Sequence, residues 1–190
     1  MRRGITTLAV FALALCLADR VAAGPYEDGQ AAYESEDYAM ALRFWRPLAD
    51  QGDAAAQHKL GNVYRLGQSV PKDPTEAARW YRKSADQGHA RAQYRLAWMY
   101  IFGQGVPQSD AEAAKWYRKA AEQGDADGQL VLGSMYHEAW LVAQDYAEAL
   151  KWYRKAADQG NAGESGSTRT PFPAQGGQQS GDCGQQVMAA

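Results

Sequence analysis

The chain has 190 residues, of which 46% are hydrophobic and 22% are charged, and its formal net charge is −2. This composition is too apolar and too aromatic for a chain that is disordered throughout, and the length suits one domain. The near-neutral charge argues against a nucleic-acid-binding protein, which usually carries a basic surface. With two cysteines, the chain cannot be a disulfide-rich scaffold or hold a cysteine-based structural zinc site.

Residues 1–23 have the pattern of a signal peptide. Arg2 and Arg3 give a basic start, residues 5–17 carry no charge, and small residues lead up to Ala23. The apolar stretch is shorter than the about 20 residues that a membrane-spanning helix needs, so we expect no transmembrane segment after cleavage. A lipid-attachment site at Cys16 is a weaker alternative because a large residue precedes it. We expect cleavage after Ala23 and a periplasmic or secreted protein.

A repeat organises the next part of the chain. Gln-Gly pairs recur at a step of 36 residues, beginning at Gln51, Gln87, Gln123 and Gln159, and an aromatic pair keeps the same step. The step predicts a repeat domain over residues 24–161. It comprises a partial unit at 25–53 and full units at 54–89, 90–125 and 126–161.

Each full unit predicts two helices joined by a turn. In the first half a small residue, a leucine and a tyrosine are spaced by four, as in Ala92, Leu96 and Tyr100, so they share one helix face. Glycines and a proline then interrupt the helix. A second helix begins at a capping box such as Ser109 with Glu112, and the Gln-Gly pair ends it.

Two departures from the repeat predict local changes. Ala139 and Leu141 replace the loop glycines of the last unit, so we expect this loop to keep its length but change its path. Pro47 stands within the second helix of the partial unit and should kink that helix or end it near Arg46.

The repeat pattern stops after residue 161. Residues 162–190 are of low complexity, and we expect them to be disordered, either as a natural tail or as a truncated or frame-shifted remnant. No role is assigned to Cys183. Because no capping unit is visible, the exposed end of the stack is a candidate surface for self-association.

The repeated residues resemble a known family. The run A-x-A-Q-x-x-L-G-x-x-Y-x-x-G-x-G-V-P, followed by A-x-x-W-Y-x-K-A-A-x-Q-G, resembles the Sel-one-like repeat, a relative of the tetratricopeptide repeat. The resemblance covers residues 54–161 well and 25–53 in part. It implies an all-α fold, an α/α superhelical solenoid of about four antiparallel helix hairpins, and a role as a protein-interaction scaffold.

The sequence offers little support for catalysis. Ser69 and Lys72 match an S-x-x-K spacing, but the S-D-N and K-T-G partners of that motif are absent, and the serine replaces a loop glycine. The three histidines fall at different registers, so we expect no metal and no cofactor. Basic residues on the second helices, such as Arg82, precede an acid by four residues, which favours a solvated face over an anion-binding stripe.

The positions that do not repeat are the candidate binding residues. Off-stripe residues of the first helices should face the concave groove, where structural demands are met by other positions. Tyr94 and Trp98 would form an exposed aromatic ridge, or else would pack against a neighbouring helix. The candidate groove residues are His58, Asn62, Arg65, Arg91, Tyr94, Trp98, Ile101, Leu130, Ser134, His137 and Trp140.

These observations favour an exported, non-catalytic scaffold that binds a protein or peptide in its groove and does not bind nucleic acid. The alternative is a cell-wall-associated hydrolase or β-lactam-binding enzyme, as in the cysteine-rich branch of the family. The cysteine pair of that branch is absent here, so its penicillin-related activity does not carry over. A nitrocefin or peptidoglycan turnover assay would separate the two hypotheses.

Overall fold

The computed structural model describes residues 24–161, which contain eight α-helices and no strand. The predicted signal peptide, the predicted tail and Cys183 lie outside the described residues. The helices are α2 (Pro25–Glu34), α3 (Tyr38–Asp50), α4 (Ala54–Leu66), α5 (Pro74–Asp86), α6 (Ala90–Phe102), α7 (Asp110–Glu122), α8 (Ala126–His137) and α9 (Tyr146–Ala156), followed by the short π-helix η1 (Ala157–Asn161).

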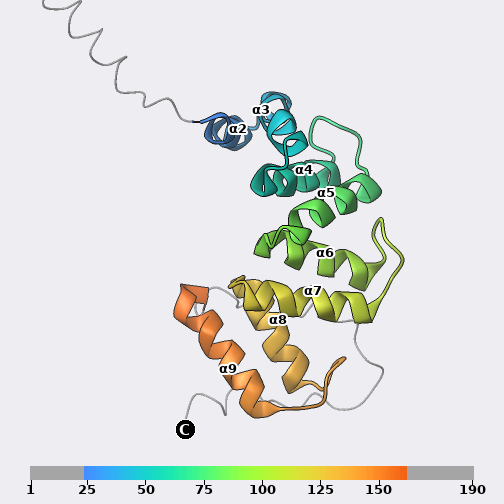
Figure 1. Ribbon diagram of the computed structural model, residues 1–190, viewed down its shortest axis with the longest axis vertical. Coiled ribbons are helices and arrows are strands. Elements are labelled where there is room, and N and C mark those ends of the chain that lie inside the picture. The colour runs from blue at the N-terminus through green and yellow to red at the C-terminus, as the bar shows by residue number, and fades with distance from the viewer. Residues whose placement is uncertain (1–23, 162–190) are drawn as a thin grey trace, which may run out of the picture.

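Consecutive helices form hairpins that stack into one elongated body (Figure 1). α2 pairs with α3, α4 with α5, α6 with α7, and α8 with α9, and each second helix also packs against the first helix of the next hairpin. Tyr64 packs against both of the buried apolar clusters, so the core continues from the early units into the later ones. The all-α solenoid of about four hairpins is therefore confirmed.

Within a hairpin, a small residue of the first helix faces an aromatic ring of the second. A Cβ atom added to Gly61 would lie 2.5 Å from the ring of Tyr81, and one added to Gly133 would lie 2.7 Å from the ring of Tyr153. These separations are too short for carbon atoms, so glycine lets the two helices approach closely. The same register in the middle unit holds a buried Ala97.

The predicted N-caps are present. The side chain of Asp73 accepts a hydrogen bond from the backbone N–H of Glu76 at 3.0 Å, and Asp145 accepts one from Glu148 at 3.0 Å. Ser109 does the same for Glu112 at 3.3 Å. Each cap satisfies one of the four N–H groups that have no partner at a helix start, which fixes where the second helix begins.

The loop of the last unit follows the same path as its counterparts, so the expected change of path is wrong. Ala139 has a φ of 56° and Leu141 a φ of 60°, in the registers where Gly103 and Gly105 have 61° and 70°. The N–H of Asp145 donates to the carbonyl of Tyr136 at 3.0 Å. The equivalent N–H groups of Asp73 and Ser109 donate to the equivalent tyrosine carbonyls at the same distance. Packing around the loop evidently outweighs the strain of two side chains in the left-handed region.

Two outcomes were expected for Pro47, a kink or an end of the helix near Arg46, and the second does not occur. α3 continues to Asp50, and the carbonyl of Pro47 accepts a hydrogen bond from the N–H of Gln51 at 3.1 Å. Pro47 is exposed and lies in the last turn of the helix. The proline therefore removes one hydrogen bond of the helix without ending it.

A buried glutamine connects each full unit to the unit before it. The side-chain amides of Gln57, Gln93 and Gln129 donate to the carbonyls of Ala49, Ala85 and Ala121 at 3.0, 3.1 and 3.2 Å. Each bond joins the start of a first helix to the end of the preceding second helix. The glutamine in the repeat pattern is therefore a connection between units.

Candidate binding surface

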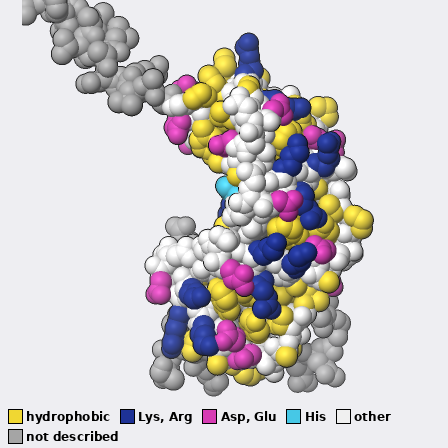
Figure 2. All heavy atoms as spheres, in the orientation of Figure 1, with side chains coloured by type: hydrophobic (Ala, Val, Ile, Leu, Met, Phe, Trp, Pro, Cys, Tyr) yellow, Lys and Arg dark blue, Asp and Glu magenta, His cyan; other side chains and the backbone are white. Residues whose placement is uncertain are grey.

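The stack is hollowed on one side, and a histidine side chain lies in the wall of the hollow (Figure 2). Side chains of α4, α6 and α8 meet one another across the unit boundaries: His58 of α4 contacts His89 at the start of α6, and Arg91 of α6 contacts Asp127 of α8. We refer to the side chains of α4, α6 and α8 that lie in this row as the inner face.

Two histidines lie at the α4–α6 boundary. The ring of His58 stacks on that of His89 with centroids 5.0 Å apart, and His89 caps α6 by accepting a bond from the N–H of Ala92 at 3.2 Å. Burial lowers the pKa of His58 to about 3, with further contributions from His89, Lys59 and other basic groups. His58 is therefore a neutral ring at physiological pH.

Asn62 and Arg65 surround the hydroxyl of a core tyrosine. Tyr81 donates to Asn62 Oδ1 at 2.8 Å, and Arg65 Nε donates to the Tyr81 oxygen at 3.2 Å. Asn62 Nδ2 also lies 3.4 Å from His58 Nε2. Burial raises the pKa of Tyr81, and the positive charge of Arg65 opposes this rise. Two of the candidate residues thus help to position a core side chain.

Arg91 connects α6 to α8. Its guanidinium lies 3.4 Å from Asp125 Oδ2 and forms a closer ion pair with Asp127. It also lies 5.3 Å from the ring centroid of Tyr94. Arg91 therefore lies on the inner face, and its charge is already balanced by two carboxylates.

The middle unit is the most aromatic part of the inner face. The ring of Tyr94 lies 5.6 Å from that of Tyr117, and Trp98 lies 4.7 Å from Phe102, which is 44% exposed. Tyr94 and Trp98 are half-buried and pack against the core from its edge. They therefore combine the two expected roles, because each packs against a neighbour and keeps part of its surface exposed.

Two candidate residues belong to the core. Ile101 is 3% exposed and Trp140 is 9% exposed, and both lie in the main apolar cluster. Ile101 occupies the register of Arg65, above the tyrosine of the second helix, where an apolar side chain is covered by its neighbours. Both side chains are buried, so the expectation that they face the groove is wrong.

The last three candidates lie on α8. Leu130 is half-buried, and Ser134 shares a hydrogen bond of 3.1 Å with the hydroxyl of Tyr153. His137 meets the ring of Tyr146 edge-on at 5.4 Å. They are spread along the helix, and Ser134 and His137 each have a neighbour within their own hairpin.

Sequence reasoning missed Arg95 and Phe102. Arg95 is half-buried in the register of Lys59 and Val131, and its guanidinium lies 5.7 Å from the ring centroid of Tyr94. Phe102 extends the aromatic surface of Trp98 by one turn. The signal was present in the sequence, because both positions vary in charge or polarity between units.

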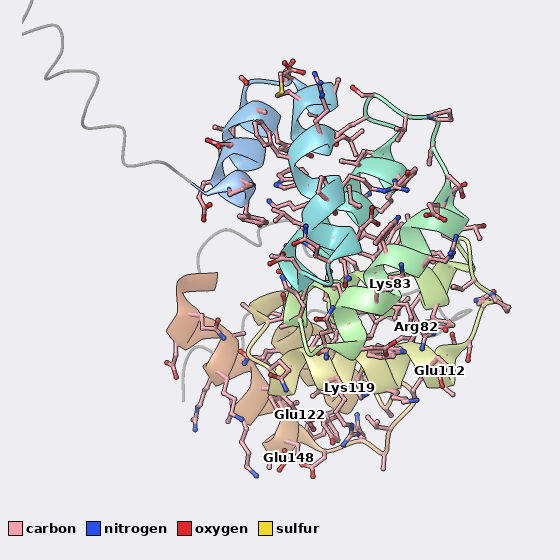
Figure 3. The ribbon with its side chains drawn as sticks, turned by 45° about the horizontal axis from the view of Figure 1, so that its top comes forward. Arg82, Lys83, Glu112, Lys119, Glu122 and Glu148 are labelled. Atoms are coloured by element: carbon pink, nitrogen blue, oxygen red, sulfur yellow. The ribbon has the colours of Figure 1, made fainter. Side chains whose placement is uncertain are left out.

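The opposite face, formed by α5, α7 and α9, carries both signs of charge. Figure 3 shows Arg82 and Lys83 on α5, Glu112, Lys119 and Glu122 on α7, and Glu148 on α9. Lysines cover tryptophan rings, as Lys83 covers Trp80 at 4.2 Å and Lys119 covers Trp116 at 4.4 Å.

The expected ion pairs on this face form at a different spacing. Within residues 24–161, Arg82 forms no ion pair with Asp86 and instead covers the ring of Trp116 at 5.1 Å. Ion pairs join residues three apart, such as Lys115 with Glu112 at 3.5 Å. The mixed charge favours a solvated face over an anion-binding stripe.

The described residues form neither of the chemical sites that the sequence suggested for consideration, a serine–lysine pair and a metal site. Ser69 is exposed in a loop with a φ of 57°, the register of Gly105, and Lys72 is exposed in the same loop. Among the residues of 24–161, no three His, Cys, Asp or Glu side chains are placed to share a metal ion. No helix in that range has the length and apolar character needed to cross a membrane.

Stacked two-helix units with a shared core and an inner row of variable side chains define an α/α repeat solenoid. The pattern of the Sel1 repeat matches residues 20–53, 54–89, 90–125 and 126–161, and the chain belongs to this family. The first match begins inside the predicted signal peptide, and the three full units agree with those expected from the sequence. No protein of curated function matches significantly.

Two solved structures resemble the chain closely. A Sel1 repeat protein from Oxalobacter formigenes is 39% identical with a TM-score of 0.68, and the match covers 72% of this chain and 56% of that one. A protective antigen with this fold from uropathogenic Escherichia coli, c5321, is 36% identical with a TM-score of 0.64, covering 72% of this chain and 30% of that one. This chain thus spans less than two thirds of either protein.

A third structure is more distant. The cysteine-rich protein B of Helicobacter pylori is 24% identical with a TM-score of 0.45, and the match covers 46% of this chain and 66% of that one. At this level of similarity it carries no inference about activity.

Proposed function

We propose that this protein is an exported, non-catalytic scaffold that holds a segment of a partner protein along its inner face. Proteins built from Sel1 repeats are generally protein-interaction scaffolds. The observation that carries the proposal for this chain is the aromatic surface of the middle unit, formed by Tyr94, Trp98 and Phe102. Partly exposed aromatic side chains near the centre of a surface are the usual anchors of protein interfaces.

The mechanism is recognition by a preformed surface. The inner-face side chains are fixed by contacts with their own hairpin or with the next one, such as the bond between Tyr81 and Asn62. A partner segment that binds there orders few side chains of the scaffold, so little conformational entropy is lost on the scaffold side. Binding then requires no movement of the helices and no chemical step.

Removal of the aromatic surface tests the proposal. The double variant Tyr94→Ala/Trp98→Ala should weaken capture of a partner at least tenfold, because truncation of anchor side chains commonly removes about 2 kcal/mol of binding free energy each. Capture can be measured by crosslinking in cells followed by mass spectrometry. The exposed single variant Phe102→Ala guards against a folding defect, and Met40→Ala, which removes a large apolar side chain that is 38% exposed on α3, is the matched control. Unchanged capture by folded double and single variants would refute the proposal.

Self-association through the last hairpin is a second candidate interaction. Large apolar residues are exposed on α9 and the loop before it: Tyr146 is 61%, Leu141 42% and Leu150 39% exposed. A second copy that packed on this end would cover them. Light scattering should then give a dimer mass that Leu150→Lys converts to a monomer mass, and a monomer at all concentrations would exclude this interaction.

Export is supported by the position of the first helix. α2 begins at Pro25, two residues after the expected cleavage site at Ala23, so cleavage there would leave every described helix intact. A mature N-terminus at Gly24 in protein recovered from the periplasm or medium would support the proposal, whereas an intact N-terminus in the cytoplasm would contradict it.

A further inference from the structure

The inner face changes character along its length. On α4 and α6 it carries Arg65 and Arg95, neither of which forms an ion pair with a described residue, whereas between α6 and α8 the charge of Arg91 is balanced by Asp125 and Asp127. Four basic groups, His89, Lys59, Arg95 and Arg91, act together on His58. Nearby acids are Glu34, which acts on Lys59, and Asp53 and Asp125, which act on His89. The α4–α6 part is therefore the more basic part of this face.

Arg95 is the least satisfied of these cations. Among the described residues it forms no hydrogen bond and no ion pair, and its Nε atom is buried without an acceptor. A buried donor without a partner costs free energy, and the folded chain supplies no acceptor for this one among the described residues. The face of Tyr94, at 5.7 Å from the guanidinium carbon, supports the cation but does not neutralise it.

Arg65 is a second cation on this part of the inner face. It gives its Nε–H to the hydroxyl of Tyr81, and its terminal nitrogens have no bond to another described residue. The positive charges of Arg65 and Arg95 both oppose the rise that burial causes in the pKa of Tyr81. A guanidinium group is suited to a carboxylate, which can accept several of its N–H groups at once.

An apolar subsite adjoins this basic one. Trp98 follows Arg95 by three residues and Phe102 by seven, so they lie along the same helix as Arg95. Seven residues of α-helix span about 10 Å. An extended peptide covers that distance with about three residues.

We propose that the partner segment is acidic, and that Arg95 binds one of its carboxylates. Trp98 and Phe102 then cover an apolar side chain about three residues away. Asp125 and Asp127 together outnumber their partner Arg91, so further acidic residues of the segment are disfavoured towards α8. This inference rests on the proposed function and adds the chemistry of the partner.

Selection from a library of random 12-residue peptides displayed on phage tests the inference. Peptides enriched by the wild-type protein should carry Asp or Glu about three residues from an aromatic or aliphatic residue. Arg95→Gln keeps most of the side-chain volume and removes the charge, so it should lose the acidic preference and keep the apolar one. Arg79→Gln is the matched control, because it removes the same charge from the opposite face and should change neither preference.

Synthetic copies of the enriched peptides give the affinity and the source of the carboxylate. Replacement of the acidic residue by its amide should weaken binding at least tenfold to the wild type and far less to Arg95→Gln. If amidation of the peptide's C-terminus has that effect instead, the bound carboxylate is a chain terminus.

The two proposals fail in different ways. Enrichment of apolar peptides without an acidic preference, or equal affinities for acid and amide, would overturn the acidic-partner inference and leave the scaffold function standing. Enrichment that is the same for the wild type and for Tyr94→Ala/Trp98→Ala would overturn both.

Discussion

The buried glutamines that join the units should differ in their contribution to stability, although they occupy the same register. The Oε1 atom of Gln57 accepts a bond from Gln87 at 2.8 Å, and that of Gln129 accepts one from Gln159 at 2.8 Å. The Oε1 atom of Gln93 is buried and has no partner within the described residues. Leucine has a similar volume, so Gln57→Leu and Gln93→Leu change polarity with little change in packing.

The magnitude follows from the bonds that each substitution removes. Gln57→Leu removes two hydrogen bonds, each worth about 1 kcal/mol, so it should lower the free energy of unfolding by about 2 kcal/mol. Gln93→Leu removes one bond and also removes a buried acceptor whose lack of a partner costs about 1–3 kcal/mol. The carbonyls of Ala49 and Ala85 each keep a second bond, from Gly52 and Gly88, so neither substitution leaves a carbonyl unpaired. Gln93→Leu should therefore be neutral or stabilising.

Urea unfolding followed by circular dichroism at 222 nm measures the difference. Both variants should unfold with the slope of the wild type, and the midpoint should fall for Gln57→Leu and stay or rise for Gln93→Leu. An equal loss of about 2 kcal/mol in both variants would refute the reasoning. It would mean that Gln93 has a partner in solution, such as the side chain of Gln123.

Three further substitutions test the histidine pair and the loops. The pKa of His58, lowered to about 3 from 6.5, means that only the unfolded chain takes up this proton between those pH values. The free energy of unfolding is therefore not reduced by this histidine above pH 6.5. It falls as the pH falls toward 3, by about 2 kcal/mol between pH 7 and pH 5. Urea midpoints at both pH values should show a smaller decline for His58→Gln, and an unchanged decline would contradict the pKa. In thermal melts, Ala139→Gly should gain about 0.5–1 kcal/mol by relieving a left-handed backbone. Gly105→Ala should lose stability because its Cβ would lie 2.1 Å from the carbonyl oxygen of Pro74. A loss of stability for Ala139→Gly, or a gain for Gly105→Ala, would contradict the assigned loop path.

The fold could be predicted because the repeat supplies the same local signals several times. The spacing of Leu96 and Tyr100, the cap at Ser109 and the final Gln-Gly pair each determine one piece of a helix hairpin, and tertiary packing agrees with all of them. The path of the last loop could not be predicted in this way. Ala139 and Leu141 argue locally against a left-handed backbone, and only the packed surroundings, which the sequence does not state, impose it.

The candidate surface was less predictable because exposure depends on neighbours in space. Ile101 has the register of a groove residue, yet it is buried, whereas Phe102 beside it is exposed. Arg95 was overlooked because a basic residue at that register reads as an ordinary solvated charge. Its significance comes from the lack of an acid within reach, which can be seen only when the neighbouring helices are in place.

Some of the variable inner-face positions also have a structural role, which the sequence analysis did not expect. The residues at positions 62, 98 and 134 share one register, and at positions 62 and 134 the residue bonds the tyrosine of its own second helix. Asn62 accepts a bond from Tyr81, and Ser134 shares one with Tyr153, whereas Trp98 offers no acceptor, and the buried hydroxyl of Tyr117 has no partner within the described residues. A polar residue at this register therefore satisfies a core hydroxyl, and an aromatic residue there gives up that bond. In the middle unit the hydroxyl of Tyr117 lacks this hydrogen bond, and the same unit has the largest aromatic surface. This arrangement is expected if position 98 contributes to binding more than to stability.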